Sequence, residues 1–115
     1  MHELSIAISL IEAAQDEAEK HKARAVVAVH LRLGAMSGVV KEALLFSYGV
    51  AAQGTPLEGS TLIIEEVPVM IFCTVCGERR PVRSPQSFCC ATCSEPAFDV
   101  VQGREIEVVG LEIDE

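Results

Sequence analysis

Two Cys-x-x-Cys pairs constrain this chain more than any other feature. They are Cys73–Cys76 and Cys90–Cys93, and the 115-residue sequence has one further cysteine, Cys89. Each pair presents two thiolates from one tight turn, and two such turns supply the four sulfurs of a tetrahedral structural Zn²⁺ site. Gly77 follows the first pair and relieves its turn because it has no Cβ. The spacing therefore predicts a small metal-stapled module.

A disulfide or a redox dithiol is the alternative reading of these cysteines. The count of five is odd, no apolar signal segment follows Met1, and no apolar run is long enough to cross a bilayer. These features indicate a cytoplasmic protein without a membrane partner, and structural disulfides rarely persist in that compartment. Zinc is therefore favoured. Cys89 and Cys93 are also within reach of one turn, but the two-residue spacing favours Cys90 as the ligand and leaves Cys89 as a spare thiol.

The composition argues against nucleic acid as a partner. Seventeen acidic residues against nine Lys and Arg give a formal charge of −8, and aromatic residues make up 4% with no Trp. Binding to phosphates depends on Lys and Arg, and binding to single strands depends on aromatic stacking. A basic or metal-bearing protein partner suits this chain better. Half of the residues are hydrophobic, so an aliphatic core is expected.

Apolar periodicity predicts two helices outside the cysteine module. Residues Leu4 to Lys20 show helical spacing of their apolar side chains, which predicts an amphipathic helix almost at the start of the chain. A second helix is expected from about Val40 to the Gln53-Gly54 pair, where the glycine suits a helix end.

Alternating and β-branched runs predict three strands. These strands are expected at Val27–Gly34, Thr61–Val67 and Arg104–Ile113. The first strand should have one strictly apolar face, formed by Val27, Val29, Leu31 and Leu33. In the last strand the apolar alternation shifts between Val108 and Val109, which a bulge near Gly110 would explain.

The order of these elements predicts an α+β fold. Two helices are expected to pack on a three-stranded sheet, with a zinc-ribbon module inserted between two of its strands. The expected domains are residues 1–68 plus 104–115, which form the α+β domain, and residues 69–103, which form the zinc ribbon.

Met1-His2-Glu3 immediately precedes the first helical turn. The terminal amine, the first backbone amides and the His2 imidazole form a compact nitrogen set that suits square-planar Ni(II) or Cu(II) better than tetrahedral zinc. Alternatively, His2 is a solvated residue ahead of a helix cap and Glu3 is a first-turn acid favoured by the helix dipole. His21 and His30 lack a second ligand and are expected to have surface or packing roles.

Together these features closely resemble the HypA/HybF family of nickel metallochaperones for NiFe-hydrogenase maturation. The resemblance covers the whole chain and rests on the following segments: Met1-His2-Glu3-Leu4-Ser5, Ile11-Glu12, the strand Val27–Gly34 and both Cys-x-x-Cys pairs. It implies that His2 is the key nickel ligand through its side chain and backbone amide, with the Met1 amine or Glu3 completing the site. It also implies a structural zinc held by Cys73, Cys76, Cys90 and Cys93.

The resemblance implies a non-catalytic carrier in which Ni²⁺ is transported and Zn²⁺ is structural. The implied partners are a nickel-binding GTPase of hydrogenase maturation, the hydrogenase large subunit and, for some relatives, urease maturation proteins. This chain departs from some members of that family at two places. Some relatives have an acid near the start of the second helix, where here only Glu42 could stand in, and some have a histidine in the zinc module, where this chain has none.

Two rival functions follow from the cysteines alone. One is a zinc-ribbon adaptor that binds only protein. The other is a thiol redox enzyme built on Cys89 and Cys90 or on one Cys-x-x-Cys pair. A hydrolase is disfavoured, because a four-cysteine zinc has no open coordination position and no nucleophile–base motif is present.

Overall fold

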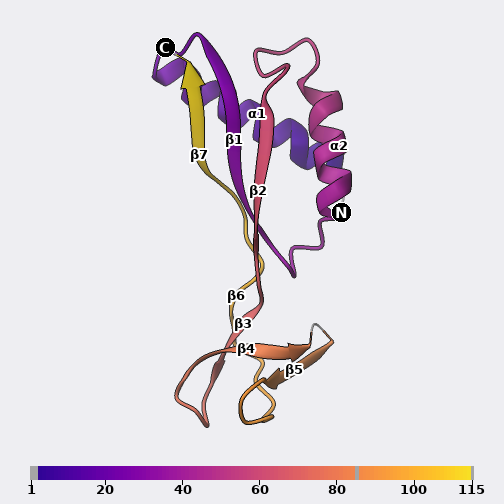
Figure 1. The fold of residues 1–115 in the computed structure, drawn as a ribbon, viewed down its shortest axis with the longest axis vertical. Coiled ribbons are helices and arrows are strands. Elements are labelled where there is room, and N and C mark those ends of the chain that lie inside the picture. Colours follow the sequence, from indigo (N-terminus) through magenta and orange to yellow (C-terminus); the bar gives the residue numbers. More distant parts are fainter. Residues whose placement is uncertain (1–2, 85, 115) are drawn as a thin grey trace. The chain divides into compact units, whose positions relative to one another are not determined.

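The computed structural model describes residues 3–84 and 86–114, drawn as a ribbon in Figure 1. The elements in chain order are α1 (Glu3–Lys20), β1 (Ala25–Gly34), α2 (Lys41–Ala52), β2 (Thr61–Val67), β3 (Met70–Cys73), β4 (Glu78–Ser84), β5 (Ser87–Cys90), β6 (Val100–Gln102) and β7 (Ile106–Asp114). The strands form a three-stranded sheet in the order β2-β1-β7 and a four-stranded sheet in the order β5-β4-β3-β6. The α+β class with two helices and a three-stranded sheet is confirmed.

The chain divides into two compact units. The first unit comprises Met1–Arg32, Gly38–Glu65 and Glu107–Glu115, and the second comprises Leu33–Ser37 and Glu66–Ile106. None of the helices in the described part of the chain is long and apolar enough to span a bilayer.

In the first unit, β1 and β2 run in the same direction and β7 runs opposite to them (Figure 1). A parallel pair needs a crossover connection, which α2 supplies between β1 and β2. At one end of the β1–β7 pair, the backbone N–H of Arg24 donates to the carbonyl oxygen of Asp114 at 2.8 Å. The last strand thus returns along the first and closes the sheet.

Helical spacing decides which side chains form the core of the first unit. The two helices contact each other and bury apolar stripes three and four residues apart. The buried helix residues are Ala7, Leu10, Ile11 and Ala14 in α1, and Leu44, Tyr48 and Ala52 in α2. Three of these residues are alanines. Apart from Tyr48, these core residues are aliphatic, as the composition predicts.

The apolar face of β1 differs from the predicted one. Val27 is 52% exposed, whereas Val26 and Ala28 are buried on the same strand as Val29. Burial shifts by one residue between Ala28 and Val29, so strict alternation does not hold along β1. The predicted apolar face of Val27, Val29, Leu31 and Leu33 is therefore buried from Val29 onward and exposed at Val27.

The neighbouring strand β7 shows a matching shift. Gly110 and Leu111 are consecutive half-buried residues, while the positions around them alternate between half-buried and exposed. The Cβ of His30 on β1 lies 4.0 Å from the position that a Cβ would occupy on Gly110. The burial pattern of β7 thus changes its alternation at Gly110, close to the part of β1 that contains His30.

The second unit is a small sheet closed by turns. β3 pairs antiparallel with β4, so that Ile71 lies opposite Arg80 and Cys73 opposite Glu78. Gly77 has φ 70° in the turn between them, a conformation that glycine adopts without strain, and its N–H donates to the Cys73 carbonyl oxygen at 2.7 Å. Strands β5 and β6 complete the two edges of the sheet.

Gly34 and Gly49 provide a matched test of this packing. A Cβ on Gly34 would lie 2.1 Å from the carbonyl oxygen of Gly103, which accepts a hydrogen bond from the Met36 N–H at 2.7 Å. Gly34→Ala should therefore destabilise the protein by about 1–3 kcal/mol or more. A Cβ on Gly49, in α2, would meet no atom within 4 Å, so Gly49→Ala should stabilise it by about 0.5–1 kcal/mol. Urea unfolding of both variants in excess zinc measures the difference, and equal midpoints would contradict the close approach at Gly34.

Candidate metal sites

Four cysteines of the second unit converge on one point. Cys73 ends β3, Cys90 ends β5, and Cys76 and Cys93 lie in the turns that follow those strands. Their four Sγ atoms all lie within 4.8 Å of one another. The Sγ atoms of Cys73 and Cys93 are 3.5 Å apart, and those of Cys76 and Cys90 are 3.9 Å apart. Four sulfurs from two turns thus surround a single site.

This sulfur set fits a tetrahedral zinc ion. With Zn–S distances of about 2.3 Å, the sulfurs of a tetrahedral site lie about 3.8 Å apart, close to the observed separations. Thiolates are soft ligands that select zinc over hard cations such as Mg²⁺. Four protein ligands fill the coordination sphere, so the site is of the closed, structural kind. When bound, zinc would cross-link the two turns.

Backbone amides prepare the two turns for negative charge. The N–H of Cys76 donates to Cys73 Sγ at 3.4 Å. In the second turn, hydrogen bonding from the backbone of Cys93 lowers the pKa of the Cys90 thiol to about 6. The backbone at Glu95 acts to lower the pKa of Cys93, but burial and the other three cysteines raise it to about 12. The Cys90 thiolate therefore forms readily. Four neighbouring thiolates repel one another, so all four form together only when a cation is bound between them.

Cys89 lies outside the four-sulfur group, although it directly precedes Cys90. Its backbone pairs with Pro96 in an isolated bridge, and its side chain is half-buried. Alternation along β5 explains the difference, because adjacent residues of a strand point to opposite faces. Geometry therefore groups Cys90 with the other three cysteines and leaves Cys89 as the extra thiol.

The expected nickel ligands lie only partly within the described residues. Met1 and His2 lie outside them. Glu3 begins α1, and its Oε2 accepts a hydrogen bond from the backbone N–H of Val40 at 3.5 Å. Val40 is the N-cap of α2 and makes no side-chain cap of its own, so the Glu3 carboxylate meets the positive end of that helix. Glu42 is exposed in the first turn of α2.

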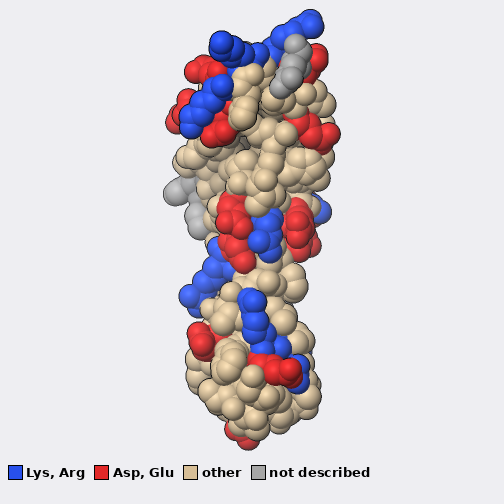
Figure 2. All heavy atoms as spheres, turned by 90° about the vertical axis from the view of Figure 1, so that its left-hand side faces the viewer, with Lys and Arg blue, Asp and Glu red and all other residues tan. Residues whose placement is uncertain are grey.

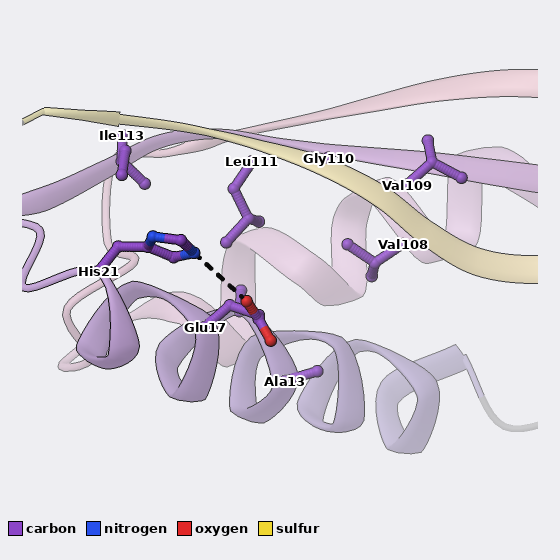
Figure 3. Close-up of a pocket in the computed structure, with 9 residues that line it drawn as sticks. Ala13, Glu17, His21, Val108, Val109, Gly110, Leu111 and Ile113 are labelled. Atoms are coloured by element: carbon purple, nitrogen blue, oxygen red, sulfur yellow. Dashed lines mark ion pairs between the residues drawn. The ribbon is translucent and has the colours of Figure 1, made fainter.

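The two other histidines have carboxylate neighbours. His30 Nε2 lies 2.7 Å from Glu112 Oε2, and His21 Nε2 lies 3.7 Å from Glu17 Oε2. Figure 3 shows the latter pair beside a pocket between α1 and β7. The remaining lining of this pocket is apolar, as is seen for Ala13, Ala14, Val108, Val109, Leu111 and Ile113. Its lining residues therefore offer one His–Glu pair and no further metal ligand.

Comparison with known proteins identifies the family. Residues 1–113 match the family model described as hydrogenase/urease nickel incorporation, metallochaperone, hypA. The chain belongs to the HypA family. A relative named hydrogenase maturation factor HypA, from Chloroflexus aurantiacus, is 49% identical over 112 residues, which cover 97% of this chain and 98% of the relative. One of the same name from Desulfosudis oleivorans is 38% identical over the full length of both chains.

Solved structures of HypA proteins share the fold. The solution structure of the Ni metallochaperone HypA from Helicobacter pylori matches with a TM-score of 0.71, covering 99% of this chain and 98% of that one. A second solution structure of a HypA protein matches with a TM-score of 0.72. Both are 23% identical to this chain. The family resemblance deduced from the N-terminal and cysteine motifs is confirmed.

Serine substitutions should separate the neighbouring cysteines. Cys90→Ser removes one of the four converging sulfurs, and we expect the purified protein to lose most of its zinc. Cys89→Ser is the matched control, and it should keep about one zinc per chain because its sulfur lies outside the group. Zinc is measured by mass spectrometry of metals after dialysis. Zinc loss in the Cys89 variant alone would reverse the assignment.

Zinc uptake should depend on the ionisation of Cys90. The thiol has a pKa of about 6, so the thiolate is present above that pH and is protonated below it. Zinc binds thiolates, so uptake by the metal-free protein should slow as pH falls through about 6, by about tenfold for each further unit. Stopped-flow uptake between pH 7.5 and 5 measures this. The Cys89→Ser protein should show the same profile, and a midpoint above pH 8 would contradict the role of Cys90.

Proposed function

We propose that this chain is a nickel metallochaperone that binds Ni(II) at its N-terminus and delivers it for maturation of NiFe-hydrogenase. The observation that carries this proposal is the match to the nickel-incorporation family over residues 1–113. The same proposal gives the four converging cysteines a separate role, which is to hold a structural Zn²⁺. Cargo and structural metal thus use different ligands in different parts of the chain.

The proposed nickel ligands are His2, through its imidazole and backbone amide, the Met1 amine and Glu3. Amine, amide and imidazole nitrogens favour square-planar Ni(II). The hydrogen bond between Glu3 Oε2 and the Val40 N–H supports a positioning role for the Glu3 side chain, because it ties the start of α1 to the start of α2. Glu3 would then contribute to the nickel site mainly through its backbone.

We propose that residues 1–68 plus 104–115 form the nickel-binding domain and residues 69–103 the zinc ribbon. The proposed partners are a nickel-binding GTPase of hydrogenase maturation, the hydrogenase large subunit and urease maturation proteins. Figure 2 shows one face of the molecule, on which acidic and basic side chains lie interspersed. A mixed surface of this kind supports recognition of proteins rather than phosphate backbones.

We also propose that the protein works in the cytoplasm and that it is not an enzyme. A reducing compartment keeps the cysteine thiols available for zinc. The four-sulfur group supports a structural role, because a zinc ion held by four protein ligands has no position left for water or substrate. Ni(II) is therefore the cargo of this protein rather than a catalytic centre.

The decisive test is nickel binding by protein with its native N-terminus. We expect one Ni(II) per chain in isothermal titration, and we expect His2→Ala to lose it while zinc stays near one per chain, since the two metals use different ligands. His21→Ala is the matched control, because His21 faces Glu17 at 3.7 Å and should not affect nickel. Hydrogenase activity in cells that carry His2→Ala should fall with nickel binding. Equal nickel binding by the wild-type and His2→Ala proteins would leave a zinc-ribbon adaptor as the better account.

A further inference from the structure

Arg80 lies beside the cysteine group on the inner face of β4. It pairs across the antiparallel β3–β4 ladder with Ile71, and opposite residues of such a ladder share one face. Ile71 is fully buried in the same cluster as Cys73 and Cys90, against which Cys76 also packs. An arginine is therefore placed at the edge of a small core formed largely by metal-binding residues.

The guanidinium of Arg80 has an unused donor. Its Nε atom is buried and has no hydrogen-bond partner, and no other buried side-chain nitrogen or oxygen of the described residues shares that condition. One Nη atom forms an ion pair with the Glu78 carboxylate. A buried donor without an acceptor is unfavourable, most of all when it belongs to a charged group. An acceptor for this N–H is expected in the functional state.

The cysteine sulfurs supply such an acceptor. The pKa of Arg80 is raised above its ordinary value, chiefly by the neighbouring Cys76 thiol and then by the charge of Glu78, which indicates that the guanidinium lies close to that sulfur. Four thiolates around one Zn²⁺ carry a net charge of about −2, so a neighbouring cation and N–H donor would be stabilised by the loaded site. Outer-shell donors of this kind orient metal ligands and tune their basicity.

We propose that Arg80 is a positioning residue of the zinc site, donating an N–H···S hydrogen bond to the zinc-bound thiolate of Cys76. This inference rests on the proposed zinc site. The hydrogen bond draws electron density from the Cys76 sulfur and offsets part of the site's negative charge. Zinc then dissociates more slowly. The Cys76 sulfur also reacts more slowly with electrophiles than it would without this hydrogen bond.

Arg79 provides the matched control on the same strand. It is exposed, and its Nη2 donates to the backbone oxygen of Val101 at 3.5 Å. Adjacent residues of a strand point to opposite faces, so Arg79 does not share the face of Arg80 and Ile71. Replacing either arginine by methionine removes the same charge from the chain, so a difference between the two variants reports position rather than net charge.

The experiment uses the full-length, zinc-loaded protein in wild-type, Arg80→Met, Arg80→Lys and Arg79→Met forms. Zinc affinity is measured by competition with a chromogenic chelator. Arg80→Met should weaken zinc binding by about 10- to 100-fold, the usual effect of losing an outer-shell partner, and Arg79→Met should leave it unchanged. Arg80→Lys should fall between them, because lysine keeps the charge but lacks the planar set of donors.

Two further readouts separate a hydrogen bond to sulfur from a general loss of stability. With Co(II) in place of zinc, the sulfur-to-cobalt charge-transfer band should shift in Arg80→Met and not in Arg79→Met. N-ethylmaleimide modification of the zinc-loaded proteins, mapped by mass spectrometry, should reach Cys76 several-fold faster in Arg80→Met. If Arg80→Met does not fold, the same two readouts on Arg80→Lys decide.

The possible outcomes separate this inference from the function on which it rests. Equal zinc affinity, cobalt spectra and Cys76 reactivity in the Arg80 and Arg79 variants, with zinc bound to all of them, would overturn the role of Arg80 and leave the zinc site intact. A wild-type protein that binds no zinc would overturn both. A selective effect of Arg80→Met with about one zinc per wild-type chain would support both.

Discussion

The convergence of four sulfurs is the constraint on which the second unit depends. The buried cluster around the sulfurs contains Ile71, Ala97 and two of the cysteines themselves, so metal-binding residues form part of the core of this unit. So small an apolar cluster cannot offset the entropy of ordering the surrounding turns. The pKa of Cys90 is lowered and that of Cys93 is raised, so without a cation the four thiols do not all ionise together near neutral pH. Bound metal thus takes the place of a larger core.

The first unit needs no metal for its fold. Its largely aliphatic core comes from two helices and the face of one sheet, and α2 connects the parallel strands β1 and β2. That placement has a consequence for the N-terminus. Because Val40 cannot cap α2 with its own side chain, the carboxylate of Glu3 meets the free amide at that helix start. This capping contact links Glu3, the residue next to the proposed nickel ligand His2, to the start of α2.

The sequence predicted those features that arise from local spacing. Cys-x-x-Cys pairs and helical apolar stripes are short-range patterns, so the fold class and the cysteine group could be read from them. The exposure of Val27 could not be predicted from the alternation within β1, because burial depends on which other elements pack against the strand. The contact between Glu3 and Val40 joins residues 37 positions apart. The unpaired Nε donor of Arg80 could not be predicted either, because its burial depends on how β3 pairs with β4.

The arginines of β4 show why overall charge says little about a metal site. The chain carries a formal charge of −8, yet three of its nine basic residues lie on this one strand. Arg80 neighbours Cys76 in the first cysteine turn, and Arg83 Nη2 donates to Ser94 Oγ at 2.5 Å directly after the second. Electrostatic interaction weakens with distance and with solvent screening, so these neighbours matter more to the thiolates than remote acids do. A cation, Arg80, thus lies beside a site that gains negative charge when its thiolates form, within a protein that is acidic as a whole.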